Sequence, residues 1–290
     1  MEQVQPTETA VERSLRVQGN DSVTGDLRLH ELTSHIFRNK RWLRVWLPPG
    51  YDDAQNETRR YPVLYLNDGQ NLFDRATAFA GVEWQVDEAA DRMIRENAIT
   101  PLIMVGIDNS TKDRFREYMP YRSLQPMRLR AEGKRYPGFL TNEVIPFIAS
   151  RYRVATGSEN TGLGGSSLGA LIALYTAMER PGLVGRLLVE SPSLWASNRQ
   201  LIKESRTIRG WPERVVLAVG TAEAGRPDKN QSVVDDVREL AGILCRAGLN
   251  EKRLRLVIEE GANHSESAWA RRFPEALRFL FGQVELHGNR

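Results

Sequence analysis

A serine lies at the centre of a glycine-rich pentapeptide in the middle of the chain. Gly165, Ser167 and Gly169 satisfy the pattern G-x-S-x-G within the segment TGLGGSSLGA. Small residues at these positions allow a strand to turn sharply into a helix, which holds the serine hydroxyl at the end of the strand in a strained conformation. Such a hydroxyl can attack a carbonyl carbon, so we predict Ser167 as a nucleophile.

The residues around the pentapeptide favour this interpretation over a glycine-rich turn that contains a serine by chance. The apolar segment ALIALYTAMER follows at once and predicts a helix that ends before Pro181 and Gly182. Residues 159–164 have few β-branched side chains, so the preceding strand is inferred from the motif and not from β-propensity.

A nucleophilic serine needs an imidazole as base and a carboxylate that orients the imidazole. In enzymes built around this type of turn, the acid and then the histidine follow the serine along the chain. His264 follows the last predicted strand and precedes the last predicted helix, whereas His30 and His35 belong to the N-terminal strands and His287 to a polar tail. The end of a parallel strand delivers side chains to a crevice. We therefore predict His264 as the base, the alternative being an ordinary surface or core histidine.

Two acidic residues follow the next-to-last predicted strand. Glu223 lies close to the end of that strand, whereas Asp228 lies farther along, in the segment GRPDKN. A triad acid needs a tightly held backbone, so Glu223 is favoured and Asp228 remains the alternative. Without a triad, both would be solvated loop charges.

Two backbone N–H groups must stabilise the negative charge that develops on the carbonyl oxygen. Leu168, directly after the serine, supplies the first of them. The second is expected from the loop after an early strand, and the segment DGQN follows the apolar run 63–66. We assign it to the N–H of Gln70, the alternative for this loop being an ordinary Asp-Gly turn.

The elements that position these residues alternate between short apolar runs and longer segments of helical period. This alternation is typical of a parallel sheet covered by helices on both faces. Residues 25–48 precede it and predict an antiparallel strand pair. The expected strands are 63–66, 102–107, 186–190, 215–219 and 254–258, and the expected helices are 86–96, 140–152, 168–179, 232–247 and 267–281.

The length of 290 residues fits one large α/β domain. No repeat, low-complexity tract or linker marks a second one. We expect a flexible N-terminal segment over residues 1–20 and a single domain over residues 21–290. The irregular stretch 108–137 is long for a compact domain and is expected to be a substrate-shaping loop.

The composition excludes several other classes of protein. Lys and Arg exceed Asp and Glu by 40 to 37 and alternate with them along the chain, which does not favour nucleic-acid binding. The single Cys245 excludes an intrachain disulfide and a cysteine-based metal site. Since the first twenty residues lack a signal-like apolar run and no membrane-length run follows, we expect a cytoplasmic protein that does not bind the membrane. No metal and no organic cofactor are expected.

With these residues assigned, the chain resembles the esterase family of α/β-hydrolases that includes enterobactin-type siderophore esterases, feruloyl esterases, S-formylglutathione hydrolases and mycolyltransferases. The resemblance extends from about Arg41 to Gly282. It implies the α/β-hydrolase fold, with Ser167 as nucleophile, His264 as base and Glu223 as acid. The segments that carry it are RVWLPPGYD, YPVLYLNDGQNLFD, RFREYMPY, GGSSLG, VGTAE and NHSESAW, with Ala170 where the family often has a second glycine.

The resemblance leaves the substrate open. Arg114 and Tyr118 match the R-x-x-E-Y segment of the family, and we include both among the substrate-binding residues. Trp84 and Trp195 are assigned as apolar walls of the cleft, with burial in the core as the alternative. A basic loop over a cleft would bind an anionic acyl group or a siderophore, although solvated charges with one or two ion pairs are the favoured interpretation. The further basic residues of this loop are Lys112, Arg116, Arg122, Arg128, Arg130, Lys134 and Arg135.

These observations together predict a serine carboxylesterase that hydrolyses small-molecule carboxylic esters through an acyl-enzyme. The alternatives are a specialised siderophore or feruloyl ester hydrolase, an acyltransferase with an acceptor other than water, and a hydrolase-fold binding protein without catalysis. The sequence leaves open whether the protein forms a homo-oligomer.

Overall fold

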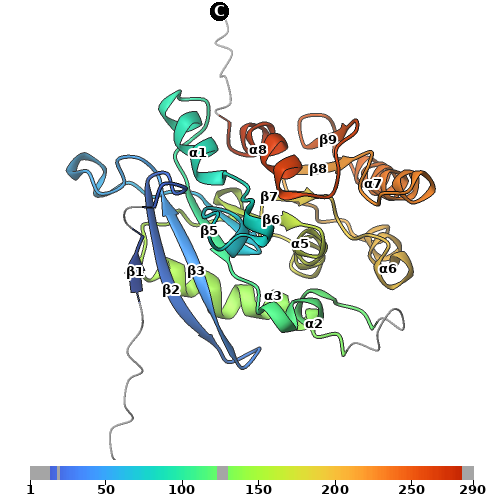
Figure 1. Ribbon diagram of the computed structural model, residues 1–290, viewed down its shortest axis with the longest axis horizontal. Coiled ribbons are helices and arrows are strands. Elements are labelled where there is room, and N and C mark those ends of the chain that lie inside the picture. Colours follow the sequence, from blue (N-terminus) through green and yellow to red (C-terminus); the bar gives the residue numbers. More distant parts are fainter. Residues whose placement is uncertain (1–13, 18–19, 123–129, 283–290) are drawn as a thin grey trace, which may run out of the picture.

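A sheet of nine strands forms the centre of the computed structural model, which describes residues 14–17, 20–122 and 130–282 (Figure 1). The strands lie in the order β1-β2-β3-β5-β4-β6-β7-β8-β9. Their bounds are β1 Ser14–Arg16, β2 Asp26–Ser34, β3 Asn39–Leu47, β4 Val63–Asn67, β5 Ile103–Ile107, β6 Thr161–Ser166, β7 Arg186–Glu190, β8 Arg214–Gly220 and β9 Leu254–Glu259.

Strands β4 to β9 run parallel to one another, whereas β1, β2 and β3 pair in antiparallel fashion and β3 joins the parallel strands through β5. The fold class predicted from the sequence is therefore confirmed: a mostly parallel sheet with an antiparallel strand pair at its N-terminal side. Each of the apolar runs that predicted a strand forms one.

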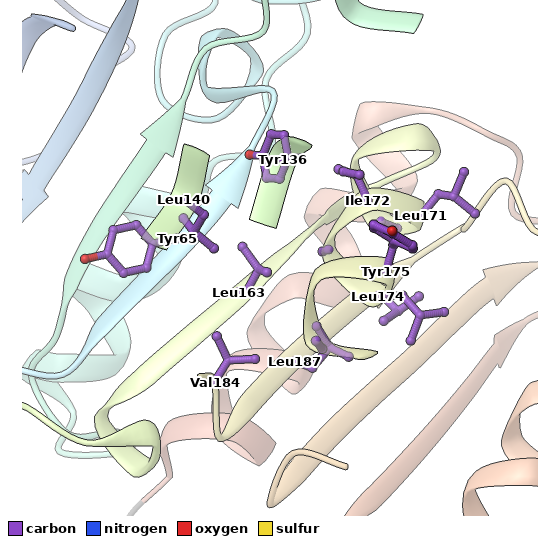
Figure 2. Close-up of a cluster of buried hydrophobic side chains, with 14 of the residues drawn as sticks. Tyr65, Tyr136, Leu140, Leu163, Leu171, Ile172, Leu174, Tyr175, Val184 and Leu187 are labelled. Carbon is purple, nitrogen blue, oxygen red and sulfur yellow. The ribbon is translucent and has the colours of Figure 1, made fainter. Parts of the chain in front are cut away.

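Helices cover both faces of the sheet, and alternate residues along a strand point to opposite layers. In β4, Leu64 and Leu66 belong to the hydrophobic cluster under α1 and α8, while Val63 and Tyr65 belong to the cluster under α3, α4, α5 and α7. Figure 2 shows α5 side chains packed over Leu163 and Leu187 of the sheet. The helices are α1 Val86–Arg95, α2 Arg114–Tyr118, α3 Tyr136–Phe139, α4 Ile145–Ala149, α5 Leu168–Glu179, α6 Ala196–Ser205, α7 Pro227–Arg246 and α8 Glu266–Phe281.

The helix expected over residues 140–152 begins earlier and is interrupted. Its two α-helical parts, α3 and α4, are joined by a π-helical turn over Leu140–Val144. Pro146 lacks the N–H that a regular helix would use at this point, which accounts for the wider turn. The long stretch 108–137 is also not wholly irregular, because α2 lies within it. Arg128 of this stretch and His287 of the C-terminal tail lie outside the described residues.

Strand β6, which precedes Ser167, forms although its sequence has low β-propensity. The physical reason is packing: a Cβ atom at Gly164 would lie 2.7 Å from the Cβ atom of Leu188 on β7. The neighbouring strand therefore supplies the side chain that fills this position. A glycine-rich strand is stable here because its partners on both sides are apolar and buried.

Candidate active site

Ser167 occupies the sharp turn between β6 and α5. Its backbone has φ 56° and ψ −122°, a conformation that a non-glycine residue rarely adopts. Its N–H donates a 2.9 Å hydrogen bond to the carbonyl oxygen of Glu190 at the end of β7. The end of β6 and the first turn of α5 approach each other closely here, since a Cβ atom at Gly165 would lie 2.9 Å from the carbonyl carbon of Gly169. The G-x-S-x-G spacing thus satisfies a steric requirement of this turn.

The imidazole of His264 and the carboxylate of Glu223 are in direct contact, with Nδ1 and Oε2 2.5 Å apart. Glu223 follows β8, and His264 lies between β9 and α8. The other carboxylate oxygen of Glu223 accepts hydrogen bonds from the N–H of Gly220 and the hydroxyl of Ser191, both at 2.7 Å. Burial opposes ionisation of Glu223, but the hydrogen bonds from His264, Ser191 and Gly220 outweigh it and lower its pKa.

Asp228, the other acid considered from the sequence, is not brought to the histidine. It lies in the first turn of α7, where its side chain is 67% exposed and pairs with Arg226 at 3.2 Å. Glu223 has a side-chain exposure of only 2%. Of the two acids, the structure therefore places Glu223 against His264.

Ser167 and His264 line the same cleft, which has a volume of about 360 Å³. Within the described part of the chain, no hydrogen bond joins the two side chains, and Oγ of Ser167 lies instead 3.2 Å from Oγ of Ser193. Catalytic hydrogen bonds are often absent or long in the free form of an enzyme. The cleft is lined by Asp68, Gln70, Asn71, Phe79, Asn109, Thr111, Arg114, Ser166, Ser167, His264, Glu266 and Trp269.

The two residues predicted to supply oxyanion N–H groups lie at the start of short helical segments beside this cleft. Leu168 is the first residue of α5, and Gln70 lies in a single 3₁₀ turn over Gly69–Asn71 that follows β4. The first N–H groups of a helix have no acceptor within the helix, so the places of these two residues are compatible with the prediction that their N–H groups bind an oxyanion.

An ion pair between the partly buried Arg114 and the buried Asp68 holds the loop that carries Gln70. Asp68 adopts a left-handed conformation with φ 60°. Its carboxylate accepts hydrogen bonds from Nε and Nη2 of Arg114 at 2.7 and 2.8 Å, and from the amide of Asn109 at 2.7 Å. The side-chain amide oxygen of Gln70 accepts a 3.2 Å bond from the N–H of Asn109. These contacts fix the turn by side chains from the following loop.

The structure corrects three of the substrate-binding assignments. Trp84 is 2% exposed and packs against Trp269 and Phe273, so it lies behind the cleft wall. Tyr118 is fully buried, with its hydroxyl 3.3 Å from the N–H of Asp68. Trp195 is exposed but is not among the cleft-lining residues. Arg114 does line the cleft, although its guanidinium is engaged by Asp68.

The R-x-x-E-Y segment consequently has a structural explanation. Its glutamate, Glu117, is fully buried and accepts hydrogen bonds from Arg41 at 2.9 Å and from Asn39 at 2.6 Å. Arg114 pairs with Asp68, and Tyr118 packs edge to face on Tyr136. The three residues anchor α2 to the strands and to the loop after β4.

Several residues of the site were not predicted from the sequence. Ser191 and Ser193 follow β7 at the same sheet edge, a position that could have indicated them. Asp68 precedes Gln70 by two positions. Glu266 and Trp269 lie within the NHSESAW segment, in which only the histidine was assigned a role. Phe79 follows the oxyanion loop and is 73% exposed in the cleft.

Neither a metal-binding cluster nor a membrane-spanning helix is present among the described residues, which leave out 1–13, 18–19, 123–129 and 283–290. No group of three or more His, Cys, Asp or Glu side chains is arranged to hold a metal ion. No helix in the same residues is long and apolar enough to cross a membrane.

Comparison with known proteins shows the family and the fold of the chain. The chain is 24% identical over 257 residues to the uncharacterized protein YbbA of Bacillus subtilis, covering 87% of this chain and 96% of YbbA. It is 26% identical over 203 residues to the Iron(III) salmochelin esterase of Escherichia coli, covering 64% of this chain and 43% of that protein. The crystal structure of the BES protein from Bacillus cereus has the same fold, with a TM-score of 0.70, 19% identity and coverage of 98% of this chain and 100% of that chain. The family model described as Putative esterase matches residues 34–280, and the resemblance seen in the sequence is thereby confirmed: the chain belongs to this esterase family.

Proposed function

We propose that this esterase is a serine carboxylesterase with Ser167 as nucleophile, His264 as base and Glu223 as the acid that orients the base. The observation that carries the proposal is the contact between Glu223 and His264 at the mouth of the cleft that holds the strained Ser167 turn. An ionised, almost fully buried carboxylate against Nδ1 leaves Nε2 of the imidazole as the atom that accepts a proton.

The reaction begins with a rotation of the Ser167 side chain from Ser193 toward His264. Oγ attacks the ester carbonyl carbon while Nε2 of His264 takes its proton. The N–H groups of Leu168 and Gln70 bind the oxyanion. His264 then protonates the departing alkoxide, which leaves as an alcohol, and an acyl-enzyme remains. Water repeats the sequence on the acyl-enzyme and releases the carboxylic acid.

A siderophore ester hydrolase is the second candidate, because one relative is an Iron(III) salmochelin esterase. The contacts of Arg114 do not favour it. Nε and Nη2 of this cleft-lining guanidinium donate to the carboxylate of Asp68, which compensates most of its charge, so it attracts an anionic substrate less than an unpaired arginine would. We therefore favour a carboxylesterase for esters without several negative charges.

The test is covalent labelling with a fluorophosphonate, followed by intact-mass measurement, together with hydrolysis of short p-nitrophenyl esters. We expect one label on the wild-type protein and none on Ser167→Ala. Ser193→Ala is the matched control, because it removes the neighbouring hydroxyl and should still be labelled. A folded wild-type protein that takes no label, or a label that persists in Ser167→Ala, would overturn the assignment.

A further inference from the structure

Among the ionisable side chains that line the cleft, the negative charges exceed the positive charges. Asp68 and Arg114 form an ion pair with distances of 2.7 and 2.8 Å, so their charges largely cancel. His264 is in contact with Glu223. The remaining ionisable side chain of the lining is Glu266, which has no ion-pair partner among residues 14–17, 20–122 and 130–282. One carboxylate in the cleft is therefore uncompensated.

The backbone places this carboxylate beside the reacting groups. Glu266 is the first residue of α8 and follows His264 by two positions. Burial, with the nearby Asp68 adding to it, raises the pKa of Glu266 above its ordinary value, although its own N–H, His264 and Arg114 act in the opposite direction. The positive end of the α8 dipole also favours a carboxylate in the first turn. Glu266 thus contributes a negative charge within electrostatic reach of the histidine.

Apart from Arg114, no basic residue in the described part of the long loop lines the cleft. Glu132 interacts with Arg116 and Arg130, both at 3.6 Å, and with Arg135 at 3.3 Å, and Arg116 also pairs with Asp113 at 3.5 Å. These guanidinium groups are engaged with carboxylates of their own segment. None of the three lines the cleft.

An exposed aromatic ring shares the cleft with this carboxylate. Phe79 lines the same space and is 73% exposed, which is unusual for a large apolar side chain. An aromatic face together with a carboxylate forms a suitable environment for an alkylammonium group, because the ring quadrupole and the negative charge both attract a cation.

We propose that Glu266 is a specificity-determining residue and that this cleft selects esters with a positively charged group, such as a quaternary ammonium, over neutral esters of the same shape and over anionic ones. The inference rests on the proposed serine esterase function and adds the substrate class to it. It separates this chain from a hydrolase for polyanionic substrates.

Three p-nitrophenyl esters with the same three-carbon spacer test the proposal. They are the esters of 4-(trimethylammonio)butanoate, of its neutral isostere 5,5-dimethylhexanoate, and of glutarate as the monoester. For each, kcat/KM is measured on the wild-type protein, on Glu266→Gln and on Glu260→Gln, with the uncatalysed rate subtracted. Glu260 is an exposed carboxylate outside the cleft lining, so its variant loses the same charge as a matched control.

We expect the wild-type protein to prefer the cationic ester over its neutral isostere by about fivefold or more, a size consistent with one charge pair in a partly solvated site. Glu266→Gln should remove this preference and raise kcat/KM for the anionic ester relative to the neutral ester. Glu260→Gln should keep the wild-type order. A wild-type preference for the anionic ester, or unchanged ratios in Glu266→Gln, would overturn the proposal.

The dependence of kcat/KM on ionic strength tests the same proposal on the wild-type protein. Raising the ionic strength from about 0.02 to 0.3 M shortens the Debye length from roughly 20 to 6 Å, so kcat/KM should fall for the cationic ester, rise for the anionic ester and stay level for the neutral ester. A flat response of all three esters would contradict a charge-based preference. Failure of the proposed function is a separate outcome, because it would appear as unchanged hydrolysis of the neutral ester by Ser167→Ala.

Discussion

The hydroxyl of Ser191 lies 2.7 Å from Oε1 of Glu223, so the carboxylate that faces His264 is also held on its other oxygen. Ser191 is itself held by two donors, Nε1 of Trp269 at 2.9 Å and Nη2 of Arg272 at 3.2 Å. Its φ of 43° is strained for a residue with a side chain. The sheet edge after β7 therefore positions the acid that follows β8.

Removal of this hydroxyl should impair catalysis without removing any reacting group. We expect Ser191→Ala to lower kcat about 10- to 100-fold with KM nearly unchanged, because a hydrogen bond to a charged group is worth about 1.5–3 kcal/mol. Steady-state kinetics measure the effect, and Ser150→Ala, at an exposed site on another part of the surface, is the control. A variant that is less stable but retains wild-type kcat would show that Ser191 has a structural role alone.

The relative importance of the two candidate acids can be measured directly. Ser167→Ala and His264→Ala should each lower kcat by about 10⁴–10⁶, and Glu223→Ala by less, because the residues of a triad act as a unit. Asp228→Ala should stay within about twofold of wild type, since its carboxylate is exposed and bonded to Arg226. If Asp228→Ala were the more damaging of the two acid variants, the assignment of Glu223 would be wrong while the fold would stand.

The ion pair between Arg114 and Asp68 should stabilise the protein and the oxyanion loop together. We expect Arg114→Met to lower the free energy of unfolding by about 2–4 kcal/mol, because it leaves the carboxylate of Asp68, which is only 5% exposed, without its cation. The double variant with Asp68→Asn should regain part of this loss, which a urea-denaturation cycle would quantify. Equal losses in the single and double variants would contradict the idea that the unpaired charge is the cause.

Stability should also depend on pH through Glu83, a carboxyl on the segment before α1. Burial, with the nearby Glu88 adding to it, raises the pKa of Glu83 to about 7. Since the folded-state pKa lies above the unfolded value of about 4.5, the folded state is favoured while the group is protonated, and this contribution is lost as the pH rises from 4.5 through 7.

Glu83→Gln should therefore increase the free energy of unfolding by about 1–3 kcal/mol at pH 8 and change it little at pH 4.5. Urea denaturation at the two pH values measures the difference. Glu57→Gln is the control, because Glu57 is exposed. A gain of equal size at both pH values would exclude ionisation of Glu83 as its source.

The sequence by itself determined the fold class and the family. Apolar runs of strand length alternating with helical periods are local patterns, and they predicted the parallel strands and most of the covering helices because each element buries its own apolar face. The strand before Ser167 could be inferred only from the motif, since its glycines carry no β-propensity and depend on the side chain of Leu188 across the sheet. Ser167, Glu223 and His264 each follow the end of a parallel strand, β6, β8 and β9, and this predicted a common location because parallel strands end at one edge of a sheet.

The tertiary structure alone decided which side chains meet at that edge. The sequence favoured Glu223 over Asp228 by its position near the strand end, but only the structure shows the contact with His264. Tyr118 was assigned to substrate binding from the R-x-x-E-Y segment, whereas the structure buries both Glu117 and Tyr118. Arg114 and Asp68 are 46 residues apart in the chain, and Ser191 and Glu223 are 32 apart. Such pairs arise from strand order and helix packing over long sequence distances, so no local pattern encodes them. The net charge of the cleft lining likewise depends on the long-range pair of Arg114 with Asp68, which leaves Glu266 without an ion-pair partner among the described residues.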